Sequence, residues 1–182
     1  CHKYGLYLFL DGARLGCGLA APDNDLTLPD IAALCDVFYI GGTKVGALFG
    51  EAVVIKNPEL AQDFRYLIKQ NGGMLAKGRL LGLQFDALFT DGLYQVISAH
   101  AIAMAEKLRE AFTAKGYTYL APNRTNQIFV IVPDAHLAKI SEQFEYSYDQ
   151  RIDATHSCVR FCTGWATKEE NVDALIRCVE QL

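Results

Sequence analysis

The stretch DVFYIGGTKVGALFGEAVV, residues 36–54, decides how the chain folds, because it joins two apolar segments through a glycine-rich turn. Residues 37–42 are rich in β-branched and aromatic side chains, which favours a strand. Residues 52–57 favour a second strand, close enough along the chain to pair antiparallel with the first. Between them stands Lys44, among four glycines. By itself, this pattern fits either a solvated surface turn or a lysine held beside a ligand, to which small residues allow close approach.

A second apolar run, LYLFLD, precedes this stretch and ends in Asp11. Its continuous apolar character predicts a strand buried on both faces, as in a parallel sheet. Asp11 would then follow the carboxyl end of the strand, where open α/β sheets bind their ligands. A local turn residue is the alternative. The distance along the chain to Lys44 suits one crossover and one strand, so adjacent parallel strands would present both side chains at one edge.

Composition and charge exclude several classes of protein. The 182 residues are 51% hydrophobic and 21% charged, with a formal net charge of −4, which is typical of a globular protein. No basic stripe points to nucleic acid, and no apolar run approaches the roughly 18 residues needed to span a membrane. The six cysteines contain no Cys-x-x-Cys motif, so we expect no metal site and interpret Cys158 and Cys162 as buried thiols. Reduced thiols indicate a cytoplasmic protein.

The pattern of elements changes at PNRTN, residues 122–126. Before it, Pro58 predicts a helix to about Lys69, and a long helical region follows over residues 80–115, with an interruption near Asp91. After it, short strands and helices alternate, and Thr167 with Glu170 predicts a capping box. We therefore expect an α/β fold: later strands of a mainly parallel sheet with helices over residues 1–121, followed by a small α+β domain over residues 122–182.

An aspartate and a lysine at one sheet edge fit the chemistry of pyridoxal 5′-phosphate. A lysine can form a Schiff base with the cofactor aldehyde. An aspartate can pair with the pyridinium nitrogen and keep it protonated, so that the ring accepts electrons from the substrate. The two residues together are a stronger signal than either one alone.

The chain also resembles the family of low-specificity threonine aldolases and β-eliminating lyases, which have pyridoxal-phosphate fold type I. The resemblance lies in LYLFLDGARLGCGLA and DVFYIGGTKVGALFGEAVV, and it continues through NGGMLAKGRLLGLQF to CVRFCTGWATKEENVDAL. It covers nearly the whole chain in the family's order. The Asp-Gly-Ala-Arg and Lys-Val-Gly-Ala elements are its most specific parts.

The resemblance implies a role for each matching residue. Asp11 would contact the pyridine nitrogen, and Lys44 would be the lysine that binds the cofactor covalently. Arg14 and Arg160 would hold the substrate carboxylate, and Thr43 would be the small hydroxyl residue beside the lysine. Asp11, Arg14, Thr43 and Lys44 would together form the cofactor-binding set. The strand around Arg160 has alternating character, which directs this side chain away from the hydrophobic face and toward a cleft between the two domains.

Two positions depart from the family's pattern. Leu75 stands where the family often has arginine after Gly-Gly-Met, and Gly164 stands where it often has histidine. These departures leave the substrate open. The resemblance also places the phosphate-binding loop, the ring-stacking residue and the base for the substrate hydroxyl upstream of Asp11. We therefore expect this chain to be the C-terminal portion of a longer enzyme, with residues 1–121 as a partial cofactor-binding domain.

The implied reaction is cleavage of a threonine-like β-hydroxy amino acid to glycine and an aldehyde. β-Elimination or transamination on the same scaffold is one alternative, and a non-catalytic fragment or assembly subunit is another. The implied partners are a small amino-acid substrate and further copies of the protein in a homodimer or homotetramer. We expect the isolated chain to be inactive.

Overall fold

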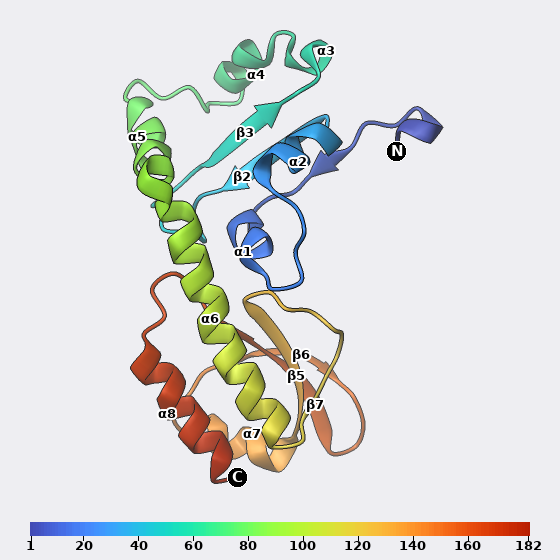
Figure 1. Ribbon diagram of the computed structural model, residues 1–182, viewed down its shortest axis with the longest axis vertical. Helices are drawn as coiled ribbons and strands as arrows, with labels where there is room; N and C mark the ends of the chain where they lie inside the picture. Colours follow the sequence, from blue (N-terminus) through green and yellow to red (C-terminus); the bar gives the residue numbers. More distant parts are fainter. The chain divides into compact units, whose positions relative to one another are not determined.

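The computed structural model describes residues 1–182, which divide into two compact units (Figure 1). The first comprises residues 1–19 and 24–97, and the second comprises residues 20–23 and 98–182. Each unit contains its own β-sheet with helices around it. The chain therefore has the mixed α/β architecture that its sequence predicts.

The first unit contains a three-stranded sheet in the order β1-β2-β3. Strands β1 and β2 are parallel, whereas β2 and β3 are antiparallel. The predicted antiparallel pair is thus confirmed, and the sheet as a whole is mixed. The elements of this unit are η1 (His2–Tyr4), β1 (Phe9–Leu10), α1 (Leu15–Ala20), α2 (Leu28–Leu34), β2 (Val37–Gly41), β3 (Glu51–Ile55), α3 (Pro58–Ala61), α4 (Phe64–Gln70), α5 (Arg79–Phe89), η2 (Thr90–Gly92) and the start of α6 (Leu93–Ala114).

One face of this sheet packs against helices and forms the core of the first unit. Helix α2 begins with a capping box, in which the Thr27 hydroxyl accepts the Asp30 N–H and the Asp30 carboxylate accepts the Thr27 N–H. The cap fixes the start of the helix and directs its apolar side toward the sheet. The buried cluster contains Ile31, Cys35, Phe38, Ile40, Val45, Leu88 and Tyr94.

The opposite face of the same sheet is exposed, so the prediction that β1 is buried on both faces is wrong. Phe9 is 59% exposed and Val53 is 48% exposed. The apolar side chains of α1 and α2 join Leu8 and Leu10 on the covered face. A continuous apolar run predicts a strand. It does not predict whether other elements of these 182 residues pack against one face of that strand or against both.

The helices that follow β3 agree with the sequence in part. The single helix predicted from Pro58 to Lys69 is two helices, because Asp63 between them has a left-handed backbone with φ 57°. The long helical region after it is confirmed, with its predicted break. Helix α5 ends at Phe89, and Asp91, with φ 51°, turns the chain before α6.

The second unit contains a four-stranded antiparallel sheet in the order β4-β5-β7-β6. The alternation of short strands and helices predicted beyond residue 122 is present. The elements are the later part of α6, β4 (Thr118–Tyr119), β5 (Gln127–Pro133), α7 (Asp134–Ile140), β6 (Ser147–Arg151), β7 (His156–Cys162) and α8 (Glu169–Glu180).

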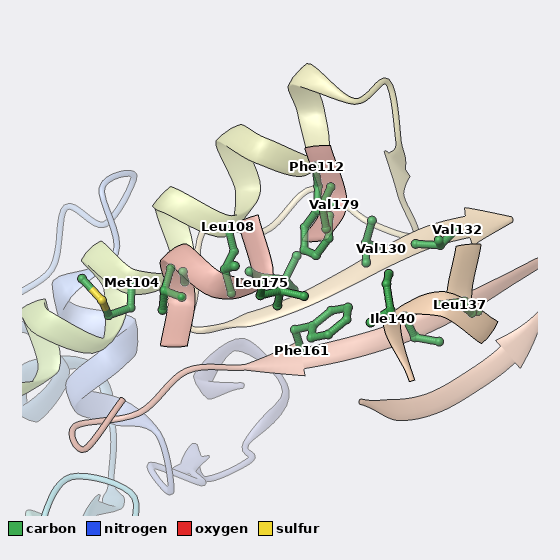
Figure 2. Close-up of a cluster of buried hydrophobic side chains, with 14 residues drawn as sticks. Met104, Leu108, Phe112, Val130, Val132, Leu137, Ile140, Phe161, Leu175 and Val179 are labelled. Atoms are coloured by element: carbon green, nitrogen blue, oxygen red, sulfur yellow. The ribbon is translucent and has the colours of Figure 1, made fainter. Parts of the chain in front are cut away.

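Helices α6 and α8 cover one face of this sheet, as Figure 2 shows. Leu108 of α6 and Leu175 of α8 meet Val130 and Phe161 of the strands. Phe112 of α6 is fully buried, and its ring centroid lies 5.3 Å from that of Phe161. This layer fixes which face of β7 points inward, and therefore which face carries Arg160.

The compact units do not divide at the predicted boundary between residues 121 and 122, because the later part of α6 packs in the second unit. That boundary was based on a change in sequence pattern. As a division between a cofactor-binding domain and a small domain, it stays a prediction.

The start of α8 differs from its predicted capping box. Its N-cap is Lys168, which forms no side-chain cap hydrogen bond. The Thr167 hydroxyl instead accepts the Gly164 N–H at 2.8 Å, and the Thr167 carbonyl accepts a hydrogen bond from His100 at 2.7 Å. The Thr167 hydroxyl is therefore used in a local turn and is not free to cap the first turn of α8.

The two neighbouring cysteines of β7 have different environments. Cys158 is buried, as predicted, and burial raises the pKa of its thiol. Cys162 is exposed, which corrects the prediction. The β6–β7 pairing begins at Arg160, so Cys162 lies beyond the part of β7 that β6 flanks. No helix of the chain is both long and apolar enough to cross a membrane.

The turn between β6 and β7 depends on Asp153, which makes its stability sensitive to acid. The Asp153 carboxylate accepts the N–H groups of Thr155 at 2.7 Å and His156 at 2.8 Å, and it also contacts the His156 ring at 3.1 Å. The Thr155 N–H is the main cause that lowers the pKa of Asp153 from 3.8 to about 2. Because the folded pKa is the lower one, the stabilisation is present above pH 3.8 and is lost as the pH falls through about 2.

Asp153→Asn should therefore lower the free energy of unfolding at neutral pH, and the difference from wild type should narrow as the pH falls from 4 to 2. Urea unfolding at a series of pH values measures this difference. Asp149→Asn, an exposed carboxylate on β6, is the matched control. A difference that stays constant down to pH 2 would contradict the assignment.

Candidate active site

The loops that follow β1 and β2 touch each other through two glycines. The Gly41 N–H donates to the Gly12 carbonyl at 2.9 Å. A Cβ on Gly12 would lie 1.7 Å from the Tyr39 carbonyl oxygen, and one on Gly41 would lie 2.3 Å from a carbonyl oxygen of the other loop. Only glycine permits this approach. The glycines thereby bring together the two loops that carry the predicted acid and the predicted lysine.

Lys44 occupies a tight turn just after β2. The N–H groups of Val45 and Ala47 both donate to the Gly42 carbonyl, at 2.9 and 3.0 Å. The Gly42 N–H in turn donates to the Glu51 carboxylate at 2.9 Å. The Lys44 side chain is exposed and forms no hydrogen bond or ion pair. The turn is therefore fixed, while the amine at its tip is available.

Asp11 is exposed directly after β1 and accepts a hydrogen bond within its own loop. The Ala13 N–H donates to its Oδ1 at 3.1 Å, and the register of β1 and β2 places Tyr39 beside it. The neighbouring Tyr39 hydroxyl first, and then the Ala13 N–H, lower the pKa of Asp11 below 3.8, and the charges of Lys44 and Arg14 lower it further. Asp11 is therefore an anion at neutral pH and can accept a hydrogen bond from a cationic ring nitrogen.

Arg14 lies in the same loop, partly buried, with an unused donor. Its Nε atom is buried and has no hydrogen-bond partner. Arg14 forms no ion pair with Asp11. It therefore does not serve to neutralise the carboxylate of its own loop through direct contact. Buried N–H groups are rarely left unsatisfied in folded proteins. An anionic oxygen of a ligand would satisfy this one.

Arg160 lies in the second unit, on the inner strand β7 rather than on an edge strand. Its guanidinium donates to Gln127 at 3.2 Å and to Ser147 at 3.4 Å, and it lies 6.0 Å from the Phe129 ring centroid. Its Nε is also buried and without a partner. The predicted alternation is confirmed, because the neighbouring residues Val159 and Phe161 are both in the core.

A cavity of about 360 Å³ in the second unit includes Arg160 in its lining. The other side chains are mixed: Tyr146, Phe161 and Leu175 are apolar or aromatic, whereas Thr163 and Asn171 are polar. The arginine thus borders a space with room for a small ligand.

The structure places Asp11, Arg14, Thr43 and Lys44 in the two touching loops of the first unit. Thr43 is exposed and forms no side-chain hydrogen bond. Arg160 belongs to the second unit, so its contribution to the same site stays a prediction.

Sequence reasoning missed two residues that support these loops, Tyr39 and Glu51. Both meet their partners through the strand register, which places Glu51 opposite Gly41 on the paired strand. Tyr39 lies in the predicted strand. Its hydroxyl, in an otherwise apolar segment, was the only feature of the sequence that could have indicated a role beside the site.

Comparison with known proteins gives the chain its relatives. No family model matches it. It is 32% identical over 183 residues to a low-specificity L-threonine aldolase of a Pseudomonas species, covering 96% of this chain and 50% of that protein. It is 29% identical over 178 residues to the low-specificity L-threonine aldolase of Pseudomonas aeruginosa, covering 97% of this chain and 51% of that protein. The chain thus spans about half the length of the curated relatives it matches.

Solved structures that resemble this chain also include a threonine aldolase. The threonine aldolase of Leishmania major is 42% identical and superposes with a TM-score of 0.96, over 100% of this chain and 53% of that one. The serine palmitoyltransferase of Sphingomonas wittichii, at 16% identity and a TM-score of 0.68 over 99% of this chain and 48% of that one, shares the fold alone. Over nearly its whole length the chain is therefore similar to the low-specificity threonine aldolases, the family that its sequence resembles.

Proposed function

We propose that this chain supplies the lysine-bearing part of an aldehyde-lyase that cleaves a threonine-like β-hydroxy amino acid to glycine and an aldehyde. The observation that carries the proposal is the contact between Gly12 and Gly41, because it gathers Asp11, Arg14 and Lys44 at one sheet edge. The relatives named above, which are threonine aldolases, favour aldol cleavage over elimination or transamination on this scaffold.

The residues at this edge fit pyridoxal 5′-phosphate. When bound, this cofactor supplies an electron-accepting ring that stabilises negative charge at the substrate α-carbon. The free amine of Lys44 suits its aldehyde, the ionised Asp11 suits its ring nitrogen, and the unpaired Nε of Arg14 suits an anionic oxygen. Thr43, directly before the lysine, adds a hydroxyl to this set.

Each residue has a separate task in the proposed reaction. Asp11 keeps a proton on the ring nitrogen, because its own low pKa makes it a weak base that stays charged. Arg14 and Arg160 bind the substrate carboxylate, for which the forked guanidinium is suited. Fixing the carboxylate orients the bond between the α- and β-carbons, and orientation decides which bond breaks.

The complete protein is proposed to act as a homo-oligomer. Leu80, Leu83 and Val96 are each more than half exposed on α5 and α6, and Leu48 is 86% exposed in the turn after Lys44. We propose that these exposed apolar side chains contact another copy of the protein.

A chimera tests the proposed function. In it, these 182 residues replace the matching segment of the Leishmania major threonine aldolase, whose remaining residues are kept. Because the chain matches that protein at a TM-score of 0.96, the replacement should fold and bind pyridoxal phosphate. We expect the chimera to release glycine from threonine, measured by chromatography. A folded chimera that binds the cofactor and leaves threonine uncleaved would contradict the proposal.

The 182-residue chain alone should bind pyridoxal phosphate weakly and should not cleave threonine. A phosphate group needs several backbone N–H donors, commonly at the start of a helix. The turn around Lys44 uses its Gly42, Val45 and Ala47 N–H groups internally. Absorbance titration with the cofactor and an assay for glycine test both statements, with the chimera as the positive control. Glycine release by the chain alone would overturn them.

Arg160→Lys in the chimera should raise the KM for threonine by about tenfold or more, because a single ammonium replaces a two-pronged donor. Cofactor absorbance without substrate should not change. Arg177→Lys, on the exposed side of α8, is the matched control. An unchanged KM would assign Arg160 to the structure of the second unit alone, through its bonds to Gln127 and Ser147.

A further inference from the structure

Gln84 is a polar residue within an otherwise apolar stripe on helix α5. The stripe follows the helical repeat, so its members share one face of the helix. They are Leu81, Gln84, Phe85 and Leu88. This face packs against the turn that carries Lys44. A Cβ on Gly50 would lie 2.4 Å from the Leu81 side chain, and a Cβ on Gly42 would lie 2.8 Å from the Phe85 ring.

The Gln84 side chain forms hydrogen bonds with the backbone on the far side of that turn. Its Oε1 accepts the Leu48 N–H at 2.7 Å and the Phe49 N–H at 3.3 Å. Its Nε2 donates to the Phe49 carbonyl at 3.1 Å. A side-chain amide carries both an acceptor and donors, so it can satisfy both kinds of backbone group at once. Three hydrogen bonds from one side chain thus join residues 48 and 49 to α5.

The turn needs contacts of this kind because its own backbone is permissive. It is rich in glycine, and Gly46 has a left-handed backbone with φ 97°, which glycine adopts at little cost. The Tyr94 hydroxyl, at the start of α6, holds the strand before the turn by donating to the Gly41 carbonyl at 3.1 Å. Gln84 holds the chain after it. Lys44 therefore lies between two segments that helices fix.

We propose that Gln84 is a positioning residue of this site: its amide fixes the far side of the turn and so holds the Lys44 amine at the sheet edge. The Lys44 side chain is exposed and forms no hydrogen bond or ion pair, so the backbone of its turn decides where the amine lies. The inference rests on the proposed function for what the amine does there. The connection between α5 and the turn depends only on this chain.

The first test measures amide hydrogen exchange by NMR in the 182-residue chain without cofactor. Gln84→Met keeps the length and helix propensity of the side chain but loses all three hydrogen bonds. Exchange of the Leu48 N–H should become about tenfold faster or more. Gln84→Glu still accepts this N–H, so its exchange there should stay within about threefold of the parent. Gln70→Met, at an exposed glutamine of α4 in the same unit, is the matched control.

Three results of this experiment would overturn the inference. The first is Leu48 exchange that Gln84→Met leaves unchanged. The second is exchange that Gln84→Glu raises as much as Gln84→Met does, because packing of the side chain rather than its acceptor would then protect the amide. The third needs no variant: Leu48 is 86% exposed, and an unprotected Leu48 amide in the parent chain would show that Gln84 does not hold it.

The second test uses the chimera. Gln84→Met should lower kcat by about tenfold, because a misplaced reacting group slows the chemical step, and leave the KM for threonine within about twofold. Cofactor content, measured by absorbance, should match that of the parent. Gln70→Met should change neither kcat nor KM by more than about twofold.

The two tests together separate the inference from the proposed function. An inactive parent chimera, together with faster Leu48 exchange in Gln84→Met, would reject the proposed function and support the hold of Gln84 on the turn. An active chimera whose kcat is unchanged by Gln84→Met would overturn the positioning role.

Discussion

Replacing Lys44 by arginine in the chimera should reduce threonine cleavage by about a thousandfold or more, because the residue proposed to bind the cofactor covalently is lost. Arginine keeps the positive charge but stays protonated, and so it has no free amine to react. The turn itself should survive, since it is held by the Gly42 carbonyl and by Glu51 rather than by the lysine side chain.

Lys56→Arg is the matched control for this variant. Lys56 is also exposed and follows the strand β3, but it lies outside the two touching loops. Its replacement should leave cleavage within about twofold, as for most surface substitutions. Full activity in the Lys44→Arg chimera would place the reactive amine elsewhere.

Asp11→Asn should lower kcat by about a hundredfold or more, which is the usual cost of removing one electrostatic group that acts on developing charge. The amide is neutral, so it no longer favours a proton on the ring nitrogen. Binding of threonine should change little, because the carboxylate is needed most as negative charge develops at the α-carbon. The loss should therefore appear in kcat rather than in KM.

Steady-state kinetics of the Asp11→Asn chimera measure this separation. Asp25→Asn, an exposed carboxylate in the loop before α2, is the control. A kcat within about threefold of the parent corresponds to less than about 1 kcal/mol and would assign Asp11 to its local turn with Ala13.

Much of the site was predictable because its signals are local. Asp11 and Lys44 each follow an apolar strand, and the number of residues between them suits a crossover connection. The structure confirms that these two strands are parallel neighbours. The alternation around Arg160 likewise predicted which face of β7 is buried.

Features that depend on distant partners were not predictable. The proximity of Tyr39 to Asp11 follows from the register of β1 and β2, and the bond between Glu51 and Gly42 follows from the return of β3. The exposure of Phe9 depends on which layers cover the sheet, which the composition of its strand does not encode. The sequence around Thr167 matches a capping box, but the Thr167 hydroxyl accepts a hydrogen bond from the Gly164 N–H instead.

The central claim is that Lys44 is the cofactor lysine, and peptide mapping tests it most directly. The chimera is incubated with pyridoxal phosphate and then with sodium borohydride, which makes the bond between lysine and cofactor irreversible. Mass spectrometry of the proteolytic peptides should locate the modification on Lys44, in the segment YIGGTKVGALFG. Modification of Lys56, Lys69 or Lys77 in place of Lys44 would contradict the account.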